Sequence, residues 1–391
     1  MSSRVITRRR PAAAVAQRTS VVFLRHVDWV LLLACAAIIA VGLEMVESTT
    51  RLDPVDLTGR QQVFVAVGVV GMAVMAAIPV DAWRRVLWPL YVGGVGSILA
   101  VQLVGFGARG SERWIQLPGF QLQPSELGKL LVVFALAGLL VARRGEIERA
   151  STVLAAIALA GLPAMLVFIQ PDLGTTIVYG VETIVVLFVA GLRARHLLGM
   201  LALLVALIAI VLTVLPAAGV EVLQPYQQDR LTSFLDPSAD PTTSGYNQYQ
   251  SRIAIGSGGV VGKGEEGATQ TSGAFLPENH TDFVFASLGE QRGFIGGALL
   301  LGLFTIVLWR LLRAVALSSS MFGSLVAAGI FGWFLASLFI NVGMTIGVAP
   351  VTGIPLPLVS YGGSGTISAL LALGVVQSIV VRSRMAGSRL S

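Results

Sequence analysis

The fold class follows from the stretch Asp28-Trp-Val-Leu-Leu-Leu-Ala-Cys-Ala-Ala-Ile-Ile-Ala-Val-Gly-Leu-Glu-Met-Val46. Every side chain between Asp28 and Glu44 is uncharged. An α-helix needs about 20 apolar residues to cross a bilayer. A basic tail precedes the stretch, as in a signal peptide, but the apolar run is too long and no clear cleavage site follows it. We therefore interpret it as a retained first transmembrane span.

The rest of the chain has the same character. Of its 391 residues, 55% are hydrophobic and 12% are charged, and the mean hydropathy is +0.80. A typical soluble domain is about 25% charged. The composition excludes a soluble globular enzyme and a disordered chain, and it predicts an all-α polytopic membrane protein. The net charge of +6 is no nucleic-acid signature, because no basic stripe alternates with aromatic residues, so we expect no nucleic-acid partner.

Cysteine and histidine are too sparse for common metal sites. Cys35 is the single cysteine, which excludes a disulfide within the chain and a thiolate cluster. The histidines are His26, His196 and His280, and their scatter argues against a zinc site.

Ten apolar segments predict about ten transmembrane helices, with both chain ends on one side of the membrane. The connection 216–293, between spans seven and eight, is long for a loop without structure, and such loops are often functional. We expect one membrane domain over 28–382, a basic tail over 1–27 and a short tail over 383–391. The expected segments are 28–46, 62–80, 86–106, 127–142, 151–169, 173–191, 197–215, 294–312, 321–347 and 367–382.

Basic residues alternate between the two sides at every connection. Of the 27 basic residues, 18 lie on the side of the termini. By the positive-inside rule, this side is expected to be cytoplasmic. These 18 include Arg310 and Arg384, for which we expect a role in orientation only. The other nine lie toward the outer face and are the candidates for chemistry. They are Arg51, Arg60, Arg109, Arg113, Lys129, Arg230, Arg252, Lys263 and Arg292.

Four polar blocks fall on the outer side, and the first runs over 107–115 and 123–129. Pro124 and Ser125 resemble a helix start, with Ser125 as the N-cap. Glu126 and Lys129 are three residues apart and therefore share a helix face, where they can pair. This pair is either structural or part of a functional site.

The second and fourth blocks have structural interpretations. Asp172, in the second block, suits either the N-cap of the next span or a functional role. The block 350–365 follows Asn341 and is rich in proline and glycine, so it cannot form a continuous helix. Such backbone is tolerated at membrane depth only against protein or a wet cavity, and we expect it to shape the site without acting directly. Glu44 and Glu182 lie within spans and face either a cavity or packed protein.

The third block, in the long connection, contains the sharpest candidate. Asp282 stands where the connection meets the membrane, beside His280 and Thr281, with several phenylalanines nearby. An apolar surround improves a carboxylate as a general base. The alternative is the N-cap of the eighth span. The run 255–264 resembles a phosphate loop but has Gly264 where Ser or Thr is needed, so it is either a flexible turn or a backbone nest for a pyrophosphate.

Six of these motifs together resemble the SEDS family (shape, elongation, division and sporulation), in family order over nearly the whole chain. The stretches 170–174, 245–247 and 341–344 favour its rod-shape branch over its division branch, while Glu112, Gln291 and 265–268 depart from the family pattern. The motifs are Arg113-Trp-Ile115, Gln123-Pro-Ser-Glu126, Gln170-Pro-Asp-Leu-Gly174, Ile255-Gly-Ser-Gly-Gly259, Pro277-Glu-Asn-His-Thr-Asp-Phe283 and Pro350-Val-Thr-Gly-Ile-Pro-Leu-Pro-Leu-Val-Ser-Tyr-Gly-Gly363.

The resemblance implies ten spans and a peptidoglycan glycosyltransferase. Such an enzyme polymerises lipid II into glycan strands on the outer face of the bacterial cytoplasmic membrane. The resemblance also implies that Asp282 is the catalytic aspartate, that lipid II, the nascent strand and membrane lipids are ligands, and that a class B penicillin-binding protein is the partner.

An inverting transfer with a pyrophosphate leaving group needs one base and positive charge at the leaving group. We therefore expect a substrate-binding set around Asp282. A divalent cation, Mg²⁺ or Mn²⁺, held by Glu126 or Asp282 could add charge, and we expect no organic cofactor. The set is Arg113, Trp114, Glu126, Lys129, Arg230, Arg252, Lys263 and His280.

Two other classes of function fit a ten-span protein. A lipid II flippase should show paired broken helices and polar groups at the midplane, whereas the polar blocks here lie outside and no repeat is visible. A non-catalytic cell-wall scaffold is the second alternative.

Overall fold

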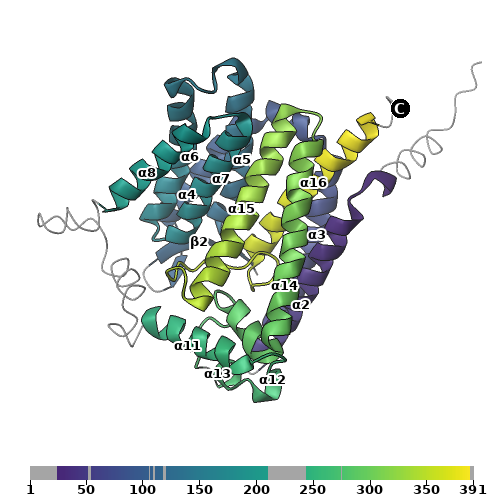
Figure 1. Ribbon diagram of the computed structural model, residues 1–391, viewed down its shortest axis with the longest axis vertical. Helices are drawn as coiled ribbons and strands as arrows, with labels where there is room; N and C mark the ends of the chain where they lie inside the picture. Colours follow the sequence, from purple (N-terminus) through teal and green to yellow (C-terminus); the bar gives the residue numbers. More distant parts are fainter. Residues whose placement is uncertain are drawn as a thin grey trace, which may run out of the picture.

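The computed structural model describes residues 24–51, 54–104, 106–108, 111–117, 120–209, 244–273 and 275–387. These residues form a bundle of long helices, with short helices gathered at the end opposite the C-terminus (Figure 1). The predicted all-α membrane fold is confirmed. Each of the ten expected segments contains a helix, although residues 210–215 of the seventh lie outside the described part; the helices are α2 (Trp29–Thr50), α3 (Leu57–Ala77), α4 (Leu87–Val104), α5 (Pro124–Ala142), α6 (Ala150–Ile169), α7 (Leu173–Ala190), α8 (Ala194–Ala209), α14 (Val284–Leu317), α15 (Met321–Ile346) and α16 (Gly363–Gly387).

Eight of the described helices are long and apolar enough to cross a membrane. The other two of the ten are shorter: the apolar part of α4 is Leu87–Gln102, and α8 has 16 residues. Two 3₁₀ turns, η1 (Val80–Arg85) and η2 (Arg144–Glu146), lie in connections between the helices.

Acidic and hydroxyl side chains start several of the helices. Asp28 accepts a hydrogen bond from Leu31 N at 3.2 Å, and Asp172 accepts one from Thr175 N at 3.0 Å, so the N-cap interpretation of Asp172 is confirmed. The expected cap at Ser125 is wrong, because α5 begins one residue earlier at Pro124. Proline suits the first helical position since its missing N–H would have no partner there.

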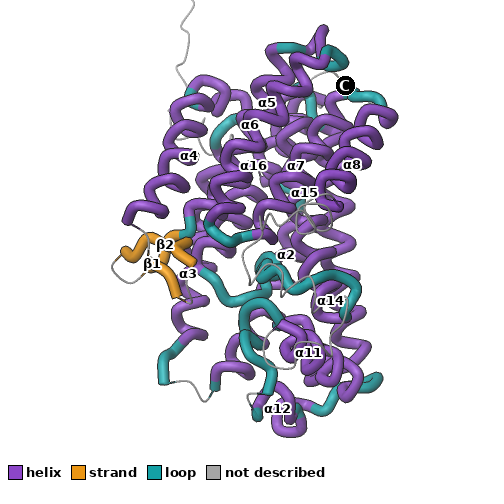
Figure 2. The backbone as a smooth tube through the Cα atoms, turned by 90° about the vertical axis from the view of Figure 1, so that its left-hand side faces the viewer, coloured by secondary structure: helices purple, strands orange, loops and turns teal. Residues whose placement is uncertain are grey.

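A small antiparallel sheet joins α4 to α5 and was not predicted. Its strands follow the order β1 (Phe106–Ala108), β2 (Ser111–Leu117) and β3 (Phe120–Leu122) (Figure 2). Trp114 pairs with Phe106, and Ile115 pairs with Leu122. The polar and glycine residues of this block hide the short apolar alternation that marks a hairpin.

The described part of the long connection is helical and packs on the bundle. It contains α11 (Ser244–Gly258), α12 (Gly264–Gly267) and α13 (Thr269–Ser272), and α11 lies against α14 and α15 (Figure 1). The glycine-rich turn after α11 binds the kinked start of α14: Gly259 O and Val260 O accept hydrogen bonds from Phe294 N and Ile295 N.

Amide groups of the same turn already have partners. Gly262 N donates to Gly258 O, and Lys263 N donates to Glu290 O. These two N–H groups therefore do not form a phosphate nest, and the run is a helix-docking turn. Glu290 is fully buried and accepts from Gln270 N, Thr271 N and Thr271 Oγ1, which fixes α13 on α14.

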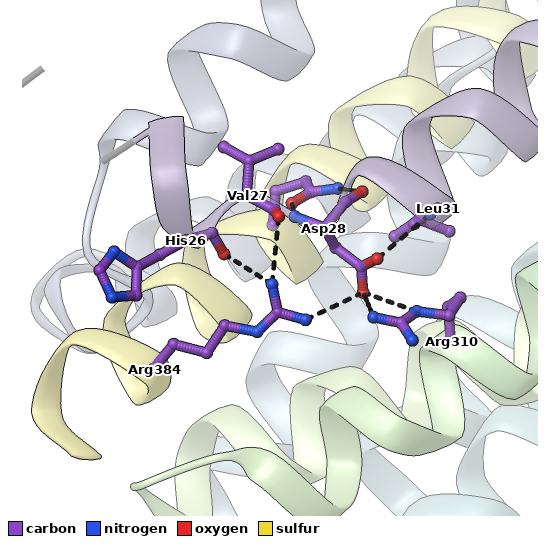
Figure 3. Close-up of polar contacts among 7 residues, drawn as sticks. His26, Val27, Asp28, Leu31, Arg310 and Arg384 are labelled. Atoms are coloured by element: carbon purple, nitrogen blue, oxygen red, sulfur yellow. Dashed lines mark hydrogen bonds and ion pairs between the residues drawn. The ribbon is translucent and has the colours of Figure 1, made fainter. Parts of the chain in front are cut away.

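A buried ion pair joins the start of the first span to α14 at the end near the C-terminus, and the last span is attached beside it. Arg310 of α14 donates to Asp28 Oδ2 from Nε at 2.8 Å, and Arg384 of α16 donates to His26 O and Val27 O (Figure 3). The expectation that Arg310 only sets orientation is wrong, because its side chain is only 5% exposed and is paired with Asp28. The pattern of charges along the chain could not reveal an acidic partner almost three hundred residues away.

Candidate functional site

Asp282 lies at the junction between the outer helices and the bundle, in the segment that leads into α14. It is half-buried, and α14 is capped by the next residue, Phe283, so the N-cap alternative for Asp282 is wrong. Phe283 is buried with Leu276 on one side of the segment, whereas Phe275 is 53% exposed. The apolar surround predicted for Asp282 therefore exists on one side only.

The segment 277–283 is bound to the proline-rich segment 350–362. Tyr361 N donates to His280 O at 2.9 Å, and Ser360 Oγ donates to Thr281 O at 2.5 Å. The second segment has no regular helix, but its residues Ile354, Leu356, Leu358 and Val359 are buried. The expectation that 350–365 packs against protein is therefore confirmed, and its role in shaping the site stays a prediction.

An aromatic cluster stands beside His280. The ring of Tyr361 lies 5.8 Å from that of His280 and 6.4 Å from that of Phe64, which in turn lies 5.7 Å from Phe120. Burial raises the pKa of the Tyr361 hydroxyl above its ordinary value, while a hydrogen bond and the charge of Arg60 act in the opposite direction. The hydroxyl is therefore neutral at physiological pH and is held by an exposed cation.

The predicted pair of Glu126 and Lys129 is confirmed. Lys129 Nζ lies 2.7 Å from Glu126 Oε1, and the two side chains are only 3% and 5% exposed. The ammonium group also lies 4.8 Å from the ring centre of Trp333 on α15. Both charged side chains are thus buried in the core of the helix bundle, within the first two turns of α5.

Glu182 is a second buried carboxyl in this core. It is fully buried in α7, and neither carboxyl oxygen has a hydrogen-bond partner among the described residues. Its helix approaches α15 closely, since a Cβ at Gly332 would lie 3.3 Å from Glu182 Cα. Of the two alternatives for Glu182, a packed position in the protein is the one observed.

Arg113 is held by the turn between α6 and α7. Its Nε donates to Gln170 O at 2.9 Å, its Nη2 donates to Pro171 O, and its Nη1 lies 4.0 Å from Asp172 Oδ2. The neighbouring Trp114 is half-buried on β2. Arg113 therefore anchors the sheet to the bundle and keeps a cation near the outer end of α7.

The remaining predicted cations lie farther out. Arg252 of α11 is exposed and rests against Gly347 at the end of α15, and Lys263 is exposed beyond α11. Arg230 lies in the part of the chain that the structure leaves undescribed. Sequence reasoning placed Arg60 on the outer side but missed its contact with Tyr361, because no local pattern joins residues so distant.

The described residues contain no preformed cluster of metal-binding side chains. They contain no group of three or more His, Cys, Asp or Glu side chains close enough to hold one. Glu126, one of the two expected ligands, is already paired with Lys129. Asp282 is the more accessible of the two carboxylates.

The fold and the site together define a multi-pass membrane protein with a carboxylate, cations and aromatic rings gathered at one end of its helix bundle. The family model of the cell cycle proteins FtsW, RodA and SpoVE matches residues 24–385. This chain belongs to that family, and it is a glycosyltransferase.

Known relatives match almost end to end. The peptidoglycan glycosyltransferase MrdB of Escherichia coli K12 is 37% identical over 362 residues, which are 92% of this chain and 95% of MrdB. The probable peptidoglycan glycosyltransferase FtsW of Tolumonas auensis is 36% identical, over 89% of this chain and 91% of FtsW.

Solved structures agree with this assignment. One chain of a peptidoglycan synthase complex that coordinates polymerization and crosslinking is 33% identical, with a TM-score of 0.79, over 91% of this chain and 98% of that chain. The rod-shape-determining protein RodA of Thermus thermophilus is 29% identical, with a TM-score of 0.64, over 92% and 97% of the two chains.

Proposed function

We propose that this peptidoglycan glycosyltransferase polymerises lipid II, with Asp282 as the general base. One observation carries the proposal: a half-buried carboxylate stands at the end of the bundle, in a backbone segment held by Asn341 and Ser360, which are distant in sequence. A base must be fixed in place yet reachable by substrate, and Asp282 meets both conditions.

The proposed reaction is a single displacement with inversion. The 4-hydroxyl oxygen of a GlcNAc acceptor attacks C1 of the donor MurNAc, while the bond from C1 to the pyrophosphate oxygen breaks. The hydroxyl proton passes to the Asp282 carboxylate, and undecaprenyl pyrophosphate leaves with the bonding electron pair. No enzyme nucleophile is needed in such a displacement.

Positive charge must meet the negative charge that develops on the pyrophosphate. Arg252 and Lys263 are exposed at this end of the molecule, while Arg113 and Lys129 are held by protein groups. We therefore assign direct substrate contact first to the exposed pair, together with His280, and a supporting electrostatic role to the held pair. Trp114, Glu126 and Arg230 stay predictions as substrate-binding residues.

A divalent cation remains a prediction of the sequence. Mg²⁺ commonly binds one or two carboxylates and completes its coordination with substrate phosphates and water. Asp282 is half-buried, whereas the Glu126 carboxylate is buried and paired with Lys129. Chelation of divalent ions with EDTA should reduce polymerisation if a cation takes part.

The orientation in the membrane is also proposed. Arg384 near one chain end contacts His26 near the other, so both tails leave the same end of the bundle (Figure 3). The excess of Arg at that end supports a cytoplasmic location of both termini. Asp282 then lies toward the outer face of the bacterial cytoplasmic membrane, where lipid II is presented.

A crosslinking partner follows from the same assignment. A chain of similar fold belongs to a synthase complex that coordinates polymerization with crosslinking. We propose that a class B penicillin-binding protein joins the present chain in this way, and that the pair serves cell elongation and rod shape. The division role is the alternative within the family.

The test is polymerisation of labelled lipid II by the purified full-length chain. We expect glycan ladders from the wild type and none from Asp282→Asn, which removes the base but keeps the shape of the side chain. Transfer of lipid II between leaflets without polymer would indicate a flippase. If the chain shows neither activity, alone or in complex with the transpeptidase, the result would indicate a scaffold. Full polymer yield from a folded Asp282→Asn protein would disprove the catalytic assignment.

A further inference from the structure

The three successive carbonyl oxygens of residues 280–282 each accept a hydrogen bond from a distant part of the chain. Tyr361 N donates to the first at 2.9 Å, Ser360 Oγ donates to the second at 2.5 Å, and Asn341 Nδ2 donates to the third at 2.9 Å. The backbone on the N-terminal side of α14 is therefore held at each residue up to and including the proposed base.

The two side-chain donors are themselves fixed. Asn341 is fully buried in α15, and its Nδ2 also donates to Ile354 O at 2.8 Å. Ser360 is only 4% exposed, and its Oγ accepts from Leu356 N at 2.8 Å while it donates to the carbonyl of residue 281. A buried hydroxyl that both accepts and donates has little freedom to rotate.

The same segment also approaches the carboxylate. Gly353 has a φ of +75°, and a Cβ added there would lie 3.3 Å from Asp282 Oδ2. A side chain at this position would be strained and would crowd the carboxylate. The segment 350–361 thus lies beside the carboxylate and binds the backbone of the two residues that precede Asp282.

We propose that Asn341 and Ser360 are positioning residues that fix the direction of the Asp282 carboxylate. This inference rests on the proposed role of Asp282 as the base. The segment before α14 has no regular secondary structure, so without these donors its backbone could rotate and move the carboxylate. A misplacement of about 1 Å in a reacting group can reduce the rate by about a hundred-fold.

The experiment compares Ser360→Ala, Ser360→Thr and Asn341→Leu in the purified full-length protein. We expect kcat for lipid II polymerisation to fall about 10- to 100-fold in Ser360→Ala and Asn341→Leu, while KM changes less than about two-fold. Ser360→Thr keeps the hydroxyl and should recover most of kcat. This division between kcat and KM separates loss of positioning from loss of substrate binding.

Ser378→Ala is the matched control. Ser378 is a fully buried serine of α16 whose Oγ donates to Ile78 O at 2.6 Å, far from Asp282 at the other end of the bundle. Its substitution removes the same kind of hydrogen bond, so we expect a similar loss of thermal stability and the kcat of the wild type.

Two outcomes would overturn the inference. One is a kcat of Ser360→Ala and Asn341→Leu equal to that of Ser378→Ala. The other is an effect confined to KM. Absence of polymer from the wild type, alone and in its transpeptidase complex, would instead disprove the proposed function, so the two failures are distinguishable.

Discussion

Glu126 and Lys129 show what spacing predicts at the scale of single residues. Residues three apart on a helix are neighbours, and the pair forms at 2.7 Å. Spacing says nothing of their depth. The helix places both in the bundle core, with Trp333 against the ammonium group and the unpartnered Glu182 on a neighbouring helix. A pair in this position balances charge within the core, in addition to any electrostatic effect that it has on the substrate.

Replacement of Lys129 with Met should destabilise the protein strongly. It leaves the Glu126 carboxylate buried without a cation, and breaking a buried ion pair costs about 3–5 kcal/mol. We expect a clear fall in the midpoint of thermal unfolding in detergent. The double variant Glu126→Gln/Lys129→Met removes both charges and should recover most of that loss.

The control for this prediction is an exposed pair with identical spacing. Arg149 and Glu146 lie 2.6 Å apart, and their side chains are 67% and 44% exposed. Exposed pairs contribute about 0.2–1 kcal/mol, so Arg149→Met should barely change the midpoint. Equal small effects of Lys129→Met and Arg149→Met would contradict the structural weight given to the buried pair.

At the scale of elements, helix α14 carries the main irregularity near the site. Its residue Gly293 has φ +64° and is non-helical, so α14 kinks at this residue, on the C-terminal side of Asp282. The kink admits the glycine-rich turn after α11: a Cβ at Gly293 would lie 2.3 Å from Gly262 N and 2.6 Å from Val260 O. The outer helices therefore dock through backbone contacts that only glycine permits.

Gly293→Ala should accordingly disrupt this docking. The conformation of Gly293, with ψ −162°, is essentially restricted to glycine and costs another residue of order 1–3 kcal/mol, and the added methyl group cannot fit without displacing the turn. We expect a lower unfolding midpoint and faster hydrogen exchange in residues 259–263.

Gly302→Ala tests the same helix without the same constraint. A Cβ at Gly302 meets no atom within 4 Å, so the substitution should be neutral or should stabilise the helix by up to about 1 kcal/mol. If Gly293→Ala behaved like Gly302→Ala, the kink would not be needed for docking.

At the scale of the whole molecule, Asp28 connects the two ends of the chain. Its carboxylate binds Arg310 of α14 and lies 3.9 Å from Arg384 of α16, while its backbone N–H donates a hydrogen bond to Gln377 Oε1 at 3.0 Å (Figure 3). These contacts join the start of the first span to α14 and to the last span, at the end of the bundle opposite Asp282. The site is thus built on helices whose far ends are fixed relative to one another.

Asp28→Asn should weaken these contacts. The substitution leaves the Arg310 guanidinium buried without a negative charge, a change that costs about 3–5 kcal/mol. Thermal unfolding should begin at lower temperature, with the kcat of the folded fraction retained because the site lies at the other end.

Glu44→Gln serves as the comparison, since it removes the other ion pair between α2 and α14. Glu44 and Arg292 are 41% and 49% exposed, so the change should cost no more than about 1 kcal/mol. A loss from Asp28→Asn as small as that from Glu44→Gln would show that the buried pair does not hold the ends together.

The sequence by itself determined the all-α membrane fold and the approximate positions of its helices, and it predicted the side on which most basic residues lie and Asp282 as a candidate base. These features depend on local hydrophobicity, on charge along the chain and on a recognisable motif, all of which are readable in one dimension. The pairing of Glu126 with Lys129 and the cap at Asp172 were also predictable, because both depend on residues within one helical turn.

Only the tertiary structure decided what surrounds these residues. It joined Asp282 to Asn341 and the neighbouring Thr281 to Ser360, placed Arg60 on Tyr361, and buried Arg310 against Asp28. It also showed that Arg113 binds the backbone at Gln170 and that the glycine-rich turn after α11 binds α14. The physical reason is that buried polar groups must find partners wherever the fold brings donors and acceptors together, and the distance along the chain does not limit that choice.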